Sequence, residues 1–219
     1  MNIPVAKVPE RKNNSLCPQG TFQARIVQII DLGTITKTVK GQEKIDRTFV
    51  FRFETPTKTA VFSKEKGEQP FLLSTNVKFY FTSEKAPNKS MLHRITLGAS
   101  MRPSNDFNIF DLLDKAMMIN VVHSEDGQYA NIESYSPMPD EMQEKARVNE
   151  LKYLYLTPES FDQAMLDSLA EYTQNKIKES PEYQQIMGEL PDGQSNAVRA
   201  ELPEIDVNEV DEMLTQSPF

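Results

Sequence analysis

Cysteine and histidine are scarce in this chain of 219 residues, and long apolar runs are missing. Cys17 is the single cysteine, which excludes a disulfide framework and a thiolate metal cluster within the chain. The two histidines, His93 and His123, show neither the HxH nor the HExxH spacing of zinc sites, and no glycine-rich phosphate loop is present. Since no stretch reaches 18 apolar residues and the N-terminus has no apolar signal region, we expect a soluble protein of the cytoplasm.

Charge is divided unevenly along the chain. Residues 1–100 hold 16 Lys and Arg against 8 Asp and Glu, whereas residues 137–219 hold 6 against 18. The net charge of −8 therefore conceals a basic first half. Such asymmetry predicts a domain that binds a polyanion, followed by an acidic tail.

The last nineteen residues, 201–219, carry six carboxylates and no Lys or Arg, and they end in Ser-Pro-Phe. Such a segment is either a solvating, disordered terminus or a peptide ligand whose acids meet a basic rim while its last side chain fills an apolar pocket. We favour the ligand. The candidate partner-binding residues are Asp211, Glu212, Pro218 and Phe219.

Turn signals and apolar patterns predict five strands, with one short helix between the third and the fourth. The strands are expected at 21–33, 47–55, 71–82, 116–123 and 128–136, and the helix at 108–115. Their order is that of an OB fold, a small closed β barrel, although five-stranded meanders and SH3-like barrels give similar patterns. We expect a flexible arm (1–19), an OB-fold nucleic-acid-binding domain (20–137), a helical extension (138–187) and a disordered acidic tail (188–219).

Three connecting segments are predicted to lack regular structure. They are a basic turn at 34–46, a lysine-bearing loop at 58–67 and an irregular stretch at 83–106. In the extension, the hydroxyl of Thr157 ahead of Pro158 predicts the start of a helix, and a second helix over 171–178 is expected to end before Pro181.

Side-chain alternation separates the strand residues into two faces. Phe49, Phe51 and Phe53 share one face and are predicted to be core, which turns Arg52 outward. Phe71, Leu73, Val77, Phe79 and Phe81 form the predicted apolar set of the third strand. In the fifth strand Tyr129 and Tyr135 are expected opposite Ala130 and Ile132.

Cations and tyrosines on the outward faces and in the basic loops suit single-stranded nucleic acid, because bases stack on rings and the backbone needs counter-charge. Lys78 and Tyr80, two residues apart, supply both on one predicted face. Any one lysine is better explained as a solubilising surface group, and any one tyrosine is equally explained as a residue of the barrel rim, but the excess of cations over the first 100 residues is not explained in this way. The candidate nucleic-acid-binding residues are Arg25, Lys37, Lys40, Lys44, Arg47, Arg52, Lys78, Tyr80, Arg94, Tyr129 and Tyr135.

Four segments of the chain are distinctive as a set. They are GTFQARIVQIIDLGT (20–34), FVFRFETP (49–56), FDLLDKAMMINVVHSEDGQYANIESYSPMP (110–139) and FDQAMLDSLAEYTQNKIKESPEY (161–183). Together they resemble a group of phage-encoded replication proteins of the single-stranded DNA-binding, OB-fold class. The ending is similar to the acidic tail of bacterial single-strand-binding proteins, which closes on Pro-Phe, but Ser217 stands where that tail tends to have an aliphatic residue.

The resemblance implies a non-enzymatic protein that binds single-stranded DNA without sequence preference. Its acidic tail would recruit replication or recombination proteins. No cofactor, metal or catalytic residue is expected, and the oligomeric state is left open between a monomer and a homodimer. The alternatives are a protein-binding adaptor of the replication machinery that does not bind DNA, and a divalent-metal nuclease that uses Asp111, Asp114 or the region of His123.

Overall fold

The computed structural model describes residues 16–39, 42–81, 89–104 and 106–188. Several sequence-based predictions lie outside these residues: Lys40, most of the N-terminal arm, residues 189–219 of the acidic tail, and with the tail Asp211, Glu212, Pro218 and Phe219. No helix in the described part of the chain is long and apolar enough to cross a membrane.

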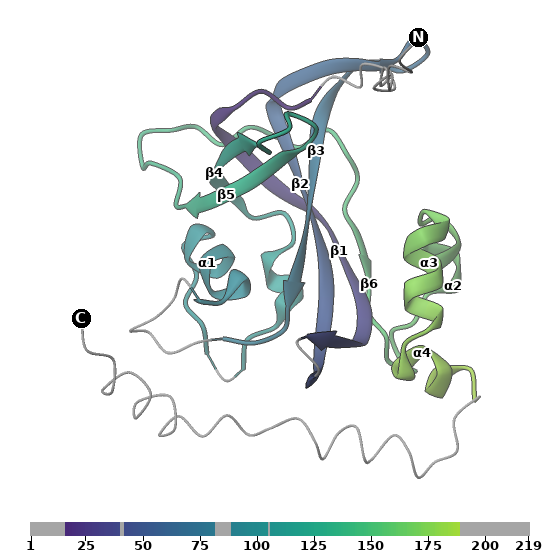
Figure 1. Cartoon of the computed structure of the whole chain (residues 1–219). Helices are drawn as coiled ribbons and strands as arrows, with labels where there is room; N and C mark the ends of the chain where they lie inside the picture. The colour runs from purple at the N-terminus through teal and green to yellow at the C-terminus, as the bar shows by residue number, and fades with distance from the viewer. Residues whose placement is uncertain (1–15, 40–41, 82–88, 105, 189–219) are drawn as a thin grey trace, which may run out of the picture.

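The protein is mainly β. Five antiparallel strands form a sheet in the order β3-β2-β1-β4-β5, and β6 pairs in parallel with β1 (Figure 1). The strands are β1 (Gly20–Val39), β2 (Gln42–Ser63), β3 (Gly67–Lys78), β4 (Ala116–His123), β5 (Ala130–Ser136) and β6 (Lys152–Leu154). Between the described strands β3 and β5, at the two ends of this order, no pairing is present, so the expected closed barrel is not shown.

Five helices accompany the sheet in the described ranges. They are α1 (Met91–Gly98), the 3-10 helix η2 (Ile109–Leu112), α2 (Gln163–Asp167), α3 (Glu171–Lys178) and α4 (Pro181–Ile186). Helix α1 and the group α2–α4 lie on opposite sides of the long strands (Figure 1). A short helix between the third and fourth strands is therefore confirmed.

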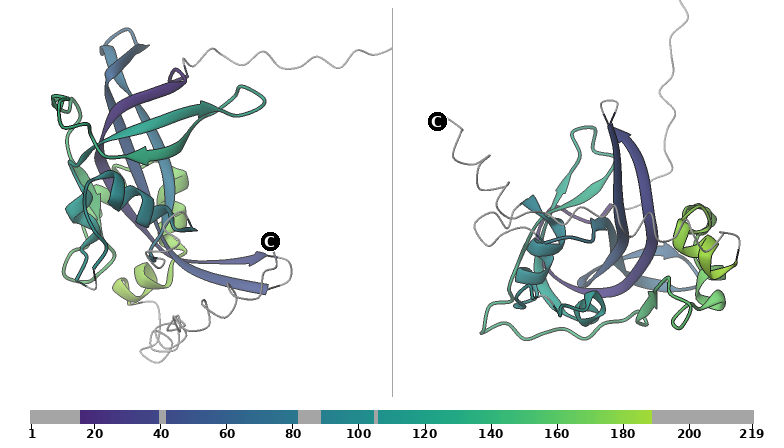
Figure 2. Two further views of the ribbon diagram at one scale, coloured as in Figure 1. Left: turned by 90° about the vertical axis from the view of Figure 1, so that its left-hand side faces the viewer. Right: turned by 90° about the horizontal axis from the view of Figure 1, so that it is seen from below.

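The first hairpin is much longer than predicted. Strand β4 and the turn at Asp126-Gly127 are where the sequence places them, but the expected basic turn at 34–46 continues β1 and β2 as a paired arm. We call residues 34–39 and 42–46 the hairpin arm; it reaches out beyond the rest of the sheet (Figure 2). Its residues ITKTV alternate in the manner of a strand, and pairing with β2 satisfies their backbone groups.

Pro56 does not end β2, contrary to the sequence-based expectation. The pairing with β3 is irregular between Thr55 and Thr59, and such an irregularity accommodates a residue that has no N–H to donate. Strand β2 therefore continues to Ser63 through part of the predicted lysine-bearing loop. Strand β3 begins and ends earlier than predicted, at Gly67 and Lys78.

The helix lies in the segment predicted to be irregular. Ser90 caps α1 by accepting a hydrogen bond from the His93 N–H, and His93, expected in a loop, is buried on this helix. The predicted helix at 108–115 is only the single 3-10 turn η2, which gives way to an extended Leu113. Burial of Leu92 and Ile95 against the sheet stabilises α1, and no local sequence pattern reports that contact.

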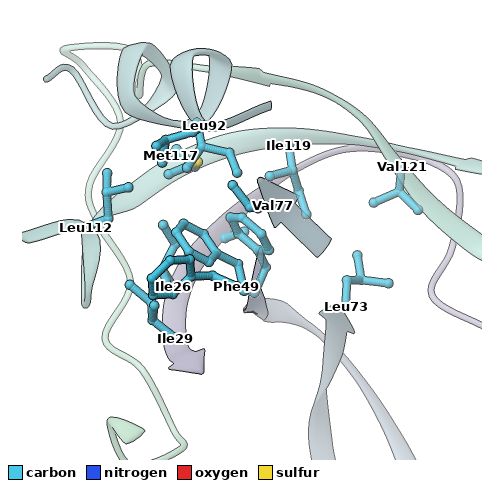
Figure 3. Packing of buried hydrophobic residues seen from close by; sticks show 14 of the residues in the cluster. Ile26, Ile29, Phe49, Leu73, Val77, Leu92, Leu112, Met117, Ile119 and Val121 are labelled. Carbon is cyan, nitrogen blue, oxygen red and sulfur yellow. The ribbon is translucent and has the colours of Figure 1, made fainter. Parts of the chain in front are cut away.

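The main core confirms the predicted face of β2. Phe49, Phe51 and Phe53 are buried together with residues of α1 and β4, which include Leu92, Met117 and Ile119 (Figure 3). Cys17 is buried in the same core, although the sequence places it in a polar arm. Phe79 departs from the prediction, because it follows the end of β3 and is 46% exposed.

A second core joins the helical extension to the opposite side of the sheet. Its buried members are Ile30, Leu32, Leu154, Leu156, Leu166, Ile177 and Tyr183. Two helix boundaries differ from prediction: Asp162 caps α2, so no helix begins at Pro158, and Pro181 begins α4 instead of ending a helix. The expected helix at 171–178 is confirmed as α3.

Candidate nucleic-acid interface

The side chains of β2 and β3 that point away from the phenylalanine core form one surface, which we call the outer face. Alternation along β2 places Lys44 and Arg52 on it, and their cross-strand partners bring Lys37 of β1 and Ser74 of β3 to the same side. Lys78 lies on it opposite Thr48. Four predicted site residues, Lys37, Lys44, Arg52 and Lys78, thus share one surface.

On the hairpin arm, Lys37 and Lys44 are direct cross-strand partners, and both are exposed. Like charges that face each other directly across a strand pair repel. A bound anion between them would relieve that repulsion. The arm therefore places two exposed cations side by side, with Glu43 and Asp46 as the acids of the same arm.

Lys78 is held loosely in the next part of the outer face. Its Nζ lies 2.6 Å from Oδ2 of Asp46, and its side chain is 47% exposed. An exposed ion pair stabilises a protein by only about 0–1 kcal/mol. Replacing the Asp46 carboxylate by a ligand phosphate as the partner of Lys78 therefore costs little free energy.

Farther along, four neighbouring strands contribute one transverse row of polar side chains. Lys152 of β6, Gln28 of β1, Arg52 of β2 and Ser74 of β3 are successive cross-strand partners. Arg52 Nε donates a hydrogen bond of 3.3 Å to Ser74 Oγ. In the described ranges no carboxylate pairs with Arg52, and its burial lowers the pKa of the guanidinium.

A hollow of about 450 Å³ opens over this row. Gln28, only 8% exposed, lines it and makes no side-chain hydrogen bond to another described residue. The far wall includes Glu150, Ala170 and Thr173; Ala170 precedes α3 and offers that helix no side-chain cap. An anion here would meet Arg52, Lys152 and the positive end of the α3 dipole, with Glu150 as the opposing charge.

The remaining predicted cations lie elsewhere. Arg25 pairs with Asp114, with Nη1 and Oδ1 3.0 Å apart, and with Glu144. Arg94 on α1 donates to the Glu133 carbonyl across 3.2 Å. Arg47 is on the inner side of the sheet, where burial acts to lower its pKa but the bond to buried Asp31 raises it above the ordinary value.

The predicted tyrosines do not join the outer face as a group. Tyr80 lies past the end of β3, and its hydroxyl donates to the Lys89 carbonyl across 3.0 Å. Tyr129 precedes β5 and is exposed at the opposite end of the sheet, beside Pro70 and Leu72.

Tyr135 corrects the predicted alternation of the fifth strand. Asn120 pairs with Ser134 and Val121 pairs with Ile132, so Glu133 is an extra residue in β5. This irregularity turns Tyr135 to the same side as Ala130 and Ile132, where its ring packs 5.5 Å from that of Phe53. Burial raises the pKa of Tyr135 to about 12.

The nuclease alternative gains no support from the geometry. Asp114 is engaged by Arg25 and by Arg147, at 3.0 and 2.9 Å. His123 Nε2 lies 2.9 Å from the Cys17 carbonyl oxygen. Within the part of the chain that the structure describes, no three His, Cys, Asp or Glu side chains gather as a metal site.

Sequence reasoning missed Gln28 and Lys152. Gln28 sits within an apolar run, and nothing local marks it. Lys152 is the first residue of KYLYL (152–156), whose strict alternation is typical of a strand and could have revealed β6. No protein-family model matches the chain, and a search of curated proteins finds no match, so the geometry has to carry the assignment.

Proposed function

We propose that the protein binds single-stranded DNA without sequence preference, along the outer face. The observation that carries the proposal is the alignment of Lys37, Lys44, Lys78 and Arg52 on one surface. Lys44 and Arg52 are eight residues apart on β2, which corresponds to about 27 Å of strand at 3.4 Å per residue. Because Val50 between them packs against the second core, the proposed path passes it over the exposed residues Ser74, Asn76 and Lys78 of β3. A backbone of several nucleotides follows such a line of cations, and nothing in it reads base edges.

The fold supports this proposal in outline. Strand order and the helical segment between β3 and β4 are those of an OB fold, and we propose that β3 and β5 complete its barrel. OB folds bind oligonucleotides on the face of their second and third strands. The outer face occupies that position here.

The biological setting follows the resemblance to phage replication proteins. We place the protein in the cytoplasm of an infected host cell, where its acidic tail recruits replication or recombination proteins through Asp211, Glu212, Pro218 and Phe219. The six carboxylates of residues 201–219 also compete weakly with DNA for the basic outer face when DNA is absent.

Fluorescence anisotropy with labelled oligo-dT, at several salt concentrations, tests the proposal. The double variant Lys37→Ala/Lys44→Ala is expected to bind more weakly, and its salt slope should fall by about 1.4 at roughly 0.7 per lost phosphate contact. Lys64→Ala/Lys66→Ala removes two exposed lysines from the β2–β3 connection and is the matched control. Duplex DNA of equal length should bind more weakly than oligo-dT. Single-stranded RNA of equal length should bind more weakly than oligo-dT or equally well.

Two results contradict the proposal. Equal losses in the two double variants would mean that binding follows net charge and not the outer face. Absence of binding to single strands, or equal affinity for duplex, would reject single-stranded DNA as the ligand and favour the adaptor.

A further inference from the structure

An aromatic pocket of about 440 Å³ lies at the end of the sheet where β3 ends. Its rings come from three separate parts of the chain: the residue after β3, the segment of η2, and β6 with the residue that follows it. We call it the aromatic pocket. Its principal lining residues are Arg47, Phe79, Phe107, Phe110, Tyr153 and Tyr155.

The rings are close together but not fully covered. The Phe110 centroid lies 5.5 Å from that of Tyr153 and 5.4 Å from that of Tyr155. Tyr153 is nonetheless 55% exposed and Phe79 is 46% exposed. Gathered aromatic rings that stay exposed mark a binding surface, because their burial by a ligand releases water from apolar area.

Arg47 is fixed in the wall of the pocket. Its Nη2 lies 2.6 Å from Oδ2 of buried Asp31, and its guanidinium carbon is 5.0 Å from the centre of the Tyr155 ring. Asp31 also accepts a hydrogen bond of 3.3 Å from the Leu156 N–H, which holds the chain after β6 in place. Because Asp31 neutralises Arg47, the pocket suits a flat, uncharged heterocycle better than a phosphate.

The rim adds hydrogen-bonding capacity. Asn108 Oδ1 accepts from the Phe110 N–H at 3.0 Å, so the side-chain amide is oriented with its NH₂ group available in the described structure. Carbonyl oxygens on a base edge are suitable acceptors for that group.

The aromatic pocket adjoins the proposed DNA path. Lys78 is on the outer face, and the next residue, Phe79, lines the pocket. The Phe79 N–H also donates to the Arg47 carbonyl at 2.9 Å, which ties the two walls together. The pocket lies on the inner side of the sheet with Arg47, so a strand whose backbone passes Lys78 on the outer face brings a base to it by turning around the end of β3.

We propose that the aromatic pocket binds one nucleobase of a DNA strand lying on the outer face, stacked against Tyr153 and Phe79. This inference rests on the proposed function. Stacking requires only a π-face, so the pocket accepts any base. It also means that β6 and the segment around η2 belong to the binding site together with the central strands.

The chain contains no tryptophan, which permits a direct optical test. Tyr153→Trp places one fluorescent ring in the pocket, and Tyr172→Trp places one on α3, where the native tyrosine is 71% exposed. Saturating oligo-dT is expected to quench the Tyr153→Trp protein and to leave the Tyr172→Trp protein unchanged. An oligonucleotide of the same length built from abasic units should bind through its phosphates without quenching either protein.

Affinity provides a second readout. Tyr153→Ala should weaken binding of oligo-dT roughly ten-fold without changing the salt slope, since loss of a ring removes stacking but no phosphate contact. Tyr172→Ala should leave both quantities unchanged.

Salt-dependent binding of oligo-dT without quenching at position 153 would contradict base binding in the aromatic pocket. It would leave the proposed function standing. Absence of binding in all proteins overturns both. Quenching by a peptide of residues 201–219, in place of quenching by DNA, would assign the aromatic pocket to the protein's own tail and would also overturn the inference.

Discussion

Arg47 and Arg52 show how surroundings decide what an arginine does. They are five residues apart on β2 and lie on opposite faces of it. Arg47 pairs with the buried carboxylate of Asp31, and its guanidinium lies over the Tyr155 ring in the wall of the aromatic pocket. Arg52 has no carboxylate partner among the described residues and faces a hollow, so its charge is available to a ligand.

Phe51 and Arg52, adjacent in sequence, should separate stability from binding. Phe51→Ala is expected to lower the free energy of unfolding by about 3–5 kcal/mol, because it leaves a cavity in the core where Phe51 is fully buried. Arg52→Ala should change stability little but weaken DNA binding and flatten its salt slope, as Lys78→Ala should. Urea denaturation and anisotropy measure the two effects. If Phe51→Ala abolished binding without loss of stability, the assignment of faces on β2 would be reversed.

Cys17 should report whether the start of the described chain is packed. It is 2% exposed, and burial raises the pKa of its thiol. Because the pKa is raised in the folded protein, the thiol's contribution to the free energy of unfolding is fully present at pH values below the ordinary thiol pKa. This contribution is lost as the pH rises through the pKa of Cys17 in the folded protein. Modification by a disulfide reagent should be slow at neutral pH, with its rate profile shifted to higher pH than in urea. Rapid reaction in the folded protein would mean that residues near Cys17 are not packed.

Among the secondary-structure elements, β1 does the most to build the site. It pairs with β2, β4 and β6, and its other contacts hold α4. Glu182 of α4 accepts hydrogen bonds from the Thr34 N–H and hydroxyl. The helical extension is thereby fixed against the sheet, and it supplies one part of the wall of the hollow and one part of the wall of the aromatic pocket.

Gly33 permits this close approach, and Gly67 provides a matched comparison. Both have left-handed φ, +73° and +65°, but a Cβ at Gly33 would lie 2.5 Å from the Ser180 Cβ, whereas one at Gly67 meets nothing within 4 Å. Gly67→Ala should cost only the backbone strain, about 1–2 kcal/mol. Gly33→Ala should cost more and should also release the extension, measured as faster hydrogen exchange in residues 163–186. An equal loss of stability in both variants would show that α4 moves away from a Cβ at position 33 at no cost in free energy.

For the whole molecule, the division of charge along the chain is the basis of the proposed function. The first hundred residues carry the cations of the outer face, and the acids are concentrated at the other end of the chain. We propose that the two halves attract each other and that a polyanion bound to the outer face displaces that attraction.

Removal of residues 201–219 should strengthen binding to single strands at low salt, because six side-chain negative charges are lost. The gain should fade as salt screens the tail, and anisotropy at increasing salt follows it. Phe219→Ala is the control: it removes no side-chain charge, so DNA binding should not change while partner capture is lost. Weaker DNA binding after truncation would make the tail part of the binding surface.

The sequence by itself determined the features that depend on local alternation and on composition. The buried face of β2, strand β4, the turn at Asp126-Gly127 and helix α3 follow from residue periodicity and turn chemistry. The division of charge needs no structure at all. These properties depend on residues close together in sequence, and in these elements the long-range packing agrees with the local pattern.

Only the tertiary structure decided which of these residues meet. The row Lys152–Gln28–Arg52–Ser74 joins four strands that are far apart in sequence, and the rings of the aromatic pocket are assembled in the same way. One extra residue in β5 turned Tyr135 into the core, and the end of β3 left Phe79 exposed. Pairing register and strand ends are set by long-range hydrogen bonding and packing. The residue pattern of a single segment does not contain that information.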